Sequence, residues 1–145
     1  MRRLIKLEFI EQLDRNLKLN NNLLQVIVSP RQVGKTTTCL DYMERAHSKR
    51  FHYVSADTVF NATPEWIVSQ WQVAAQEQKI LVIDEIQKCE NWSETIKMLW
   101  DQFRFEKKSL KCILLGSSSL QIQKGLSEEL DRTFSAYKGF SLELS

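Results

Sequence analysis

The sequence predicts an α/β fold with a mostly parallel sheet of five strands flanked by helices. Two observations support this prediction: short apolar runs alternate with longer stretches of helical periodicity, and polar clusters follow directly after several of the apolar runs. In parallel sheets, ligands bind beyond the carboxyl ends of the strands, which is where these polar clusters fall. The 145 residues leave room for one domain with a real hydrophobic core.

Strand and helix patterns alternate from the start of the chain. Between residues 4 and 19, apolar side chains recur at every fourth position and would share one face of a helix. Residues 23–28 are nearly all apolar and rich in branched side chains, which is typical of a strand covered on both faces. Residues 35–50 return to helical spacing. A strand, a loop and a helix therefore form the first unit.

The middle of the chain repeats this order. Residues 51–55 predict a strand. Thr63 and Pro64 then supply an N-cap and a proline at the first position of a helix, with Glu65 in its first turn. Residues 80–83 predict a buried strand that ends in Asp84 and Glu85.

The last part of the chain predicts three further elements. Asn91 is the expected N-cap of a helix, whose apolar face carries Ile96, Leu99, Trp100 and Phe103. Residues 112–115 predict a fourth strand that stops at Gly116, and residues 120–130 predict a helix at least in part. Residues 140–144 predict a short fifth strand.

The loop after the first strand has the pattern of a Walker A phosphate loop. Glycine lets backbone N–H groups turn inward around phosphate oxygens, and the following helix points the positive end of its dipole at them. Lys35 would reach the β- and γ-phosphates of a nucleotide, Thr36 would bind Mg²⁺, and Thr37 would contact the α-phosphate. The residues expected to bind the nucleotide are Ser29, Pro30, Arg31, Gln32, Val33, Gly34, Lys35, Thr36 and Thr37.

One position of the loop departs from the strict pattern. Ser29 stands where the first glycine is usual, and strain there would cost about 1 kcal/mol if the backbone needed glycine-like angles. Weaker nucleotide binding would follow from such strain. For the loop taken alone, the alternative interpretation is a helix start that merely contains Gly34, Lys35 and Thr36.

A second motif is the pair of carboxylates after residues 80–83. At the end of an apolar strand, Asp84 would hold Mg²⁺ through its water shell, and Glu85 would orient or deprotonate the attacking water. This is the Walker B pattern. The alternative is an acidic junction between strand and loop that faces solvent.

Further catalytic groups are expected at the same edge of the sheet. Ser117 or Ser118 would hydrogen-bond the γ-phosphate or the lytic water as a sensor, although Gly-Ser-Ser-Ser is also a common loop composition. Arg132 is the candidate cation that neutralises developing charge, in its own chain or from a neighbouring subunit, with a plain surface role as the alternative. Arg31 is a second cation near the phosphates.

Composition and charge argue against several functional classes. Lysine and arginine total 20 against 18 aspartate and glutamate residues, so no strong positive field favours nucleic acid or an anionic membrane. No apolar run is long enough to span a bilayer, and acidic residues interrupt the basic start before a signal sequence forms, so we expect the cytoplasm.

Cysteine and tryptophan usage points to structural roles. Three separated cysteines without a C-x-x-C spacing predict reduced structural thiols. Aromatic side chains stack on bases in proteins that bind single strands. Three of the four tryptophans lie in amphipathic helical patterns, however, which predicts core or interface packing. The four are Trp66, Trp71, Trp92 and Trp100.

Together, these motifs resemble the AAA-type ATPases of bacteria and archaea that carry an additional C-terminal domain of unknown function. The resemblance rests on residues 30–37, on residues 83–88 followed by Asn91-Trp92, and on residues 115–119 followed by residues 124–128, in the family's order and spacing. It implies a RecA-like core that uses ATP and Mg²⁺, with Ser117 as the sensor. Family members usually have Ala-Gly-Arg where this chain has Leu130-Asp131-Arg132, so only the arginine is kept.

The resemblance also bears on domain organisation and activity. The family's chain normally continues past the fifth strand, so we expect residues 1–145 to be a single ATP-binding domain that stops before the lid and the extra domain, as a fragment or a natural truncation. Hydrolysis by this chain alone would then be slow. The leading hypothesis is an Mg²⁺-dependent ATPase core that drives conformational change in an attached or partner domain.

Other hypotheses stay open at this point. The first alternative is a nucleotide-sensing module with little or no hydrolysis, which an intact Glu85 disfavours. ATP-coupled DNA binding is the second, and the near-neutral charge gives it little support. Whether the chain forms a homo-oligomer or binds a partner protein does not follow from the sequence.

Overall fold

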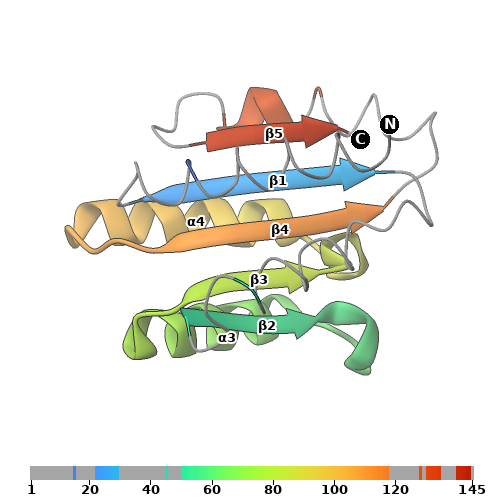
Figure 1. The fold of residues 1–145 in the computed structure, drawn as a ribbon. Helices are drawn as coiled ribbons and strands as arrows, with labels where there is room; N and C mark the ends of the chain where they lie inside the picture. The colour runs from blue at the N-terminus through green and yellow to red at the C-terminus, as the bar shows by residue number, and fades with distance from the viewer. Residues whose placement is uncertain are drawn as a thin grey trace.

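The computed structural model describes residues 22–29, 50–117, 130–134 and 140–144, together with Arg15, Arg45 and Glu128. Its centre is a five-stranded sheet in the order β2-β3-β4-β1-β5, in which every pair of neighbours is parallel. Figure 1 shows the five arrows pointing the same way, with α3 and α4 on one side of the sheet. The predicted α/β fold with a parallel sheet and flanking helices is confirmed.

The strands lie close to their predicted positions. They are β1 (Leu23–Ser29), β2 (Phe51–Ser55), β3 (Ile80–Asp84), β4 (Lys111–Ser117) and β5 (Phe140–Leu144). The prediction that the fourth strand stops at Gly116 is wrong. Gly116 and Ser117 pair with Val28 and Ser29 of β1, so backbone pairing carries β4 past the glycine.

The described helices are α3 (Pro64–Glu77) and α4 (Trp92–Phe105), and two short 3-10 turns, η2 (Ala56–Thr58) and η3 (Ile86–Lys88), follow β2 and β3. The start of α3 is as predicted: Thr63 is the N-cap, its hydroxyl oxygen accepts a hydrogen bond from the Trp66 N–H at 3.2 Å, and Pro64 opens the helix.

The start of α4 corrects the prediction for Asn91. This residue stands at the N-cap position, but its backbone is left-handed, with φ 55°, and its side chain makes no capping hydrogen bond. Thr95 engages the Asn91 carbonyl oxygen instead, through its N–H at 3.0 Å and its hydroxyl at 2.8 Å. The turn into α4 is therefore held through the Asn91 backbone.

Three predicted helices fall largely outside the described residues. Of the segments at 4–19 and 35–50, the structure describes Arg15 and Arg45, which are helical, and Arg50, which has a 3-10 conformation. Of the segment at 120–130, it describes Glu128 and Leu130, which are both helical, and residues 131–134 are helical as well.

Successive side chains of a strand point to opposite faces of the sheet. Here both faces carry buried apolar side chains. On the face covered by α3 and α4, the strands contribute Leu24, Val26, Leu81, Ile83, Cys112 and Leu114, and the helices contribute Ile67, Trp71, Ile96 and Trp100. The opposite face contributes Leu23, Ile27, Val82, Ile113 and Leu115. Apolar side chains are thus buried on both faces of the sheet.

The tryptophans and cysteines that the structure describes support this core. Packing of tryptophans in the core was predicted: Trp71, Trp92 and Trp100 are buried and Trp66 is partly buried against the same core. The Trp71 and Phe103 rings pack in a T-shaped pair with their centroids 5.4 Å apart. Cys89 and Cys112 are buried free thiols. No helix within the described residues has the length and apolar character needed to cross a membrane.

Candidate functional site

The carboxyl ends of β1, β3 and β4 form a stepped edge. Ile83, Leu114 and Val26 are level with one another across the three strands. Beyond that level β3 ends at Asp84, whereas β1 and β4 continue side by side to the paired residues Ser29 and Ser117. β4 therefore separates the strand that enters the predicted phosphate loop from the strand that carries the carboxylates, at about 10 Å from strand to strand.

The predicted phosphate loop itself lies outside the described residues, apart from its first position. The loop residues outside the description are Pro30, Arg31, Gln32, Val33, Gly34, Lys35, Thr36 and Thr37. Ser29 is the last residue of β1 and pairs with Ser117, so its backbone is extended. Any residue adopts this conformation, and the position does not need the freedom of glycine.

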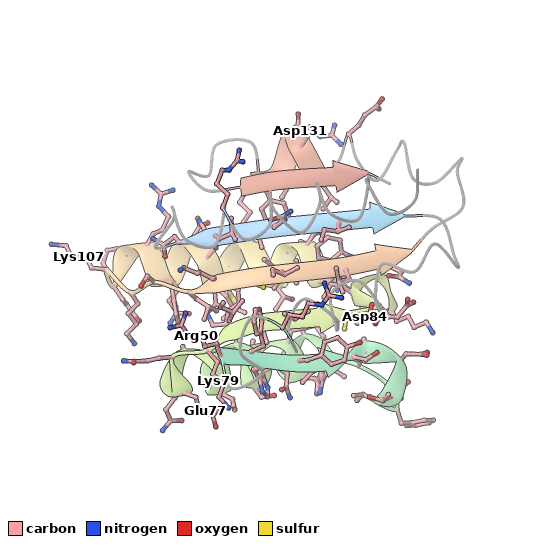
Figure 2. All side chains as sticks on the ribbon, viewed as in Figure 1. Arg50, Glu77, Lys79, Asp84, Lys107 and Asp131 are labelled. Atoms are coloured by element: carbon pink, nitrogen blue, oxygen red, sulfur yellow. The ribbon has the colours of Figure 1, made fainter. Side chains whose placement is uncertain are left out.

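Asp84 is a buried carboxylate at the end of β3, with only 5% of its surface exposed. The Tyr53 hydroxyl, from the neighbouring strand β2, donates a hydrogen bond to Asp84 Oδ2 at 2.7 Å. The Glu85 N–H donates to Asp84 Oδ1 at 2.8 Å. Each carboxylate oxygen thus has a donor, and together the two donors fix the orientation of the group. Figure 2 labels Asp84 near the tip of the β3 arrow.

Glu85 follows Asp84 in an uncommon backbone conformation. Its φ is 54° and its ψ is 43°, the left-handed region, which costs a non-glycine residue about 1–2 kcal/mol. The Gln87 side-chain amide donates to Glu85 Oε2 at 2.8 Å. Such strain persists only where the surrounding structure enforces it, and it is concentrated at functional sites.

Tyr53 and Gln87, neither of which had a predicted role, therefore hold the two carboxylates. Tyr53 contacts Asp84 because β2 is the neighbour of β3 in the sheet, and a strand order of this kind leaves no local signal in the sequence. Gln87 lies in one of the blocks that carry the family resemblance, but only the left-handed turn at Glu85 brings its amide to the carboxylate.

The remaining predicted catalytic residues are placed as follows. Ser117 ends β4 opposite Ser29, and the structure describes its strand pairing rather than its side chain. Arg132 is exposed and lies within helical residues 130–134, not after them. Figure 2 shows its neighbour Asp131 beside β5, with β1 and β4 between it and β3. The structure therefore does not bring Arg132 and Asp84 together within one chain.

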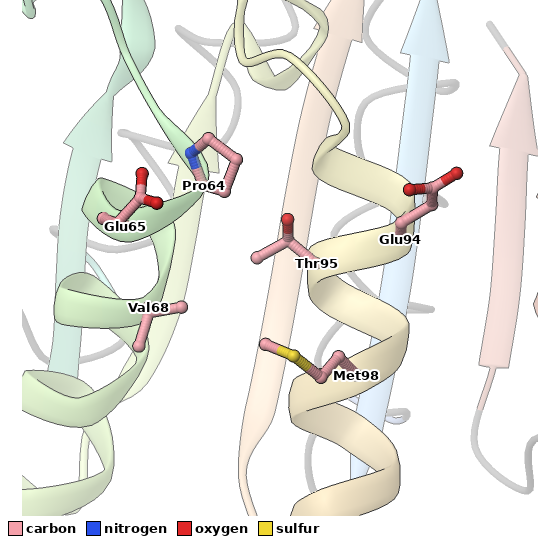
Figure 3. Close-up of a pocket in the computed structure, with 6 residues that line it drawn as sticks. All are labelled: Pro64, Glu65, Val68, Glu94, Thr95 and Met98. Atoms are coloured by element: carbon pink, nitrogen blue, oxygen red, sulfur yellow. The ribbon is translucent and has the colours of Figure 1, made fainter.

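A groove between α3 and α4 is a separate feature and suits phosphate poorly. Figure 3 shows its lining, which consists of Pro64, Glu65, Val68, Glu94, Thr95 and Met98. Its two charged residues are both acidic, and no cation lines it. Negative charge at the rim repels an anionic ligand, so the edge that carries Asp84 remains the candidate site.

The described residues offer few other metal-binding groups. Within residues 50–117 and the shorter described segments, no group of three or more His, Cys, Asp or Glu side chains is arranged to hold a metal ion. A cation at Asp84 would therefore take most of its remaining ligands from water, from a substrate or from parts of the chain outside the described residues. Mg²⁺ commonly binds proteins in this way, through one or two carboxylates.

Comparison with known proteins places the chain in a family. None of the curated proteins compared with it matches. A family model described as an AAA domain matches residues 21–145, which include all five strands, the predicted phosphate loop and the Asp84-Glu85 pair. With most of its length covered by this model, the chain belongs to the AAA domain family.

Proposed function

We propose that the chain binds ATP with Mg²⁺ at the carboxyl edge of β1, β3 and β4 and hydrolyses it to ADP and phosphate. Membership in the AAA domain family indicates a nucleotide-binding function of the ATPase type. The observation that carries the proposal further is the Asp84-Glu85 pair, placed at the same edge of the sheet as the end of β1, from which the phosphate loop starts.

The residues at this edge fit a magnesium nucleotide. The Asp84 carboxylate is buried and each of its oxygens accepts a hydrogen bond, so the group is held in one orientation, and carboxylate oxygens are the ligands that a hard cation prefers. Asp84 and Thr36 would hold the ion, which when bound neutralises charge on the phosphate oxygens. Ser29 is extended, so the missing glycine does not by itself speak against binding.

The roles of the protein groups follow from their chemistry. Lys35 would bind phosphate oxygens as a point charge. Glu85 would accept a proton from the attacking water as the water oxygen bonds to the γ-phosphorus and the bond to the leaving ADP oxygen breaks. Ser117 would hydrogen-bond the γ-phosphate or the water. Because Arg132 is exposed and its neighbour Asp131 lies beside β5, away from Asp84, we assign Arg132 to the site of a neighbouring copy rather than to its own.

Calorimetric titration with ATP and Mg²⁺ tests nucleotide binding directly. Wild type should bind, and Lys35→Ala should bind at least tenfold more weakly, because a charge-assisted contact to phosphate is worth about 1.5–3 kcal/mol. Lys79→Ala is the matched control, since Lys79 lies before β3 at the opposite edge and pairs with Glu77. Absence of binding by wild type would overturn the proposal.

Hydrolysis is tested by Glu85→Gln, which keeps the shape of the side chain and removes its basicity. The variant should bind ATP as wild type does and turn it over at least a hundredfold more slowly. Binding without turnover in wild type would instead support the nucleotide-sensing alternative. Coupling of ATP hydrolysis to conformational change in an attached or partner domain is part of the proposal. The attached or partner domain should then change conformation on addition of ATP when the wild-type chain is present, and should not change when Lys35→Ala is present.

A further inference from the structure

The turn after β3 fixes the backbone of Glu85. The Lys88 N–H donates to the Glu85 carbonyl oxygen at 3.1 Å, and the Cys89 N–H donates to the Ile86 carbonyl oxygen at 3.0 Å. Ile86 is 2% exposed and belongs to the core on the α3–α4 face. The left-handed conformation of Glu85 is therefore held between a buried strand and a buried side chain.

Gln87 reaches back over this turn to the Glu85 carboxylate. Its Nε2 donates to Glu85 Oε2 at 2.8 Å, well within the range of N–H···O hydrogen bonds. Both residues belong to the same three-residue stretch, so the contact does not depend on how the strands or helices sit relative to one another. An amide is neutral, and it orients the carboxylate without exchanging a proton with it.

The amide oxygen of Gln87 lies close to Gly116 of β4. A Cβ added to Gly116 would stand 3.2 Å from Gln87 Oε1 and 3.5 Å from Ile86 Cγ2. Gly116 belongs to the part of β4 that continues past the end of β3, next to Ser117. The missing side chain at Gly116 is thus what gives the amide room between the ends of the two strands.

We propose that Gln87 is a positioning residue for Glu85, with Gly116 providing the space it occupies. This inference rests on the proposed function, in which Glu85 accepts a proton from the attacking water. Holding one carboxylate oxygen removes rotamers in which the group points away from the water, and such alignment governs the rate of the chemical step rather than nucleotide binding.

Gln87→Met is the central test, because methionine keeps the length and apolar contacts of glutamine and removes the donor. We expect kcat for ATP to fall about tenfold to a hundredfold with KM changed less than about twofold. Gly116→Ala should lower kcat in the same direction by crowding the amide, with Gln87 itself intact. An unchanged or raised kcat in Gln87→Met would overturn the inference.

A double-mutant cycle separates positioning from a general structural role. If Gln87 acts through Glu85, adding Gln87→Met to Glu85→Gln should lower the residual rate less than about twofold further. A full additive loss would show that Gln87 acts elsewhere, and the inference would be wrong. Equal affinities of wild type and Gln87→Met for ADP with Mg²⁺, measured by calorimetry, are required as well.

A measurement without nucleotide keeps this inference separable from the proposed function. In NMR spectra of the unliganded protein, the Gln87 side-chain amide protons should shift when Glu85 is replaced by Ala. The exposed amide of Gln76, on α3, is the control and should not move. Insensitive Gln87 protons would refute the contact even if ATP binds. Shifted protons without ATP binding would retain the contact and refute the ATPase.

Discussion

The two oxygens of Asp84 are held by donors of different kinds: the Glu85 N–H, which belongs to the turn, and the Tyr53 hydroxyl, which comes from another strand. Tyr53→Phe removes only the second donor. We expect the free energy of unfolding to fall by about 1–2 kcal/mol, because a buried acceptor oxygen loses one hydrogen bond. Urea unfolding followed by tryptophan fluorescence measures the change.

A matched hydroxyl deletion shows whether this effect belongs to the site. The Ser69 hydroxyl donates to the Trp66 carbonyl oxygen at 2.7 Å on the exposed side of α3. Ser69→Ala should change stability by less than about 0.5 kcal/mol and leave nucleotide binding unaltered. Tyr53→Phe should also raise the Mg²⁺ concentration needed for nucleotide binding, since Asp84 is then less well oriented. Equal effects of the two substitutions would contradict the role given to Tyr53.

The sequence alone did not reveal the backbone conformation of two residues at the site, Ser29 and Glu85. Ser29 breaks the phosphate-loop pattern, and only its pairing with Ser117 shows that the position is extended and free of the expected strain. Glu85 fits the Walker B pattern, yet no neighbouring residue in the sequence predicts its left-handed backbone. That conformation depends on the buried strand before it and on Ile86 after it.

At the scale of elements, helix ends show how backbone conformation sets stability. Gln78 follows α3 in a left-handed conformation, with φ 57°, and its N–H donates to the Ala75 carbonyl oxygen at 3.3 Å. Glycine adopts this conformation without steric cost and is the usual residue at such a helix end. Gln78→Gly should therefore raise the free energy of unfolding by about 1 kcal/mol.

Glycine two residues earlier, in Gln76→Gly, should lower the free energy of unfolding instead of raising it. Gln76 is exposed within α3, and glycine at such a position costs about 1 kcal/mol because it adds backbone freedom to the unfolded chain. Thermal unfolding of the two variants and wild type checks both signs. A Gln78→Gly variant less stable than wild type would mean that the glutamine side chain makes a larger contribution than its backbone strain.

The elements that the sequence predicted well are those defined by local pattern. The strands at 51–55 and 140–144 have the predicted bounds because apolar runs end at turn residues. Thr63 caps α3 as expected because the capping contact spans only three residues. Asn91 does not cap α4 with its side chain, because its backbone is left-handed rather than extended as an N-cap requires. The Tyr53–Asp84 contact escaped prediction because it needs the order of strands in the sheet.

At the scale of the whole molecule, the core on the α3–α4 face brings together elements from most of the described chain. It takes side chains from β1, β3, β4, α3 and α4, and also Leu130 and Phe134 from the helical residues near the C-terminus. Both described cysteines belong to it. Burial raises the pKa of the Cys89 thiol from 9.0 to about 11 and raises the pKa of Cys112 further. Folding therefore keeps both thiols protonated in mildly alkaline solution.

This burial predicts a loss of stability at alkaline pH. Below pH 9 both states hold the thiol protons, and the thiols add no pH dependence. Between pH 9 and 11 the unfolded chain releases these protons while the folded chain keeps them, so the free energy of unfolding falls as pH rises, by up to about 1.4 kcal/mol per pH unit for each thiol. Urea unfolding at several pH values from 8 to 10.5 measures this slope.

A Cys89→Ala, Cys112→Ala double variant starts from lower stability because it creates cavities. The slope of its unfolding free energy against pH should nevertheless be shallower than that of wild type, because the two thiols no longer contribute. The other groups that titrate at alkaline pH are the same in both proteins. Parallel slopes would mean that the folded state exposes its thiols to ionisation, contrary to their burial in this core.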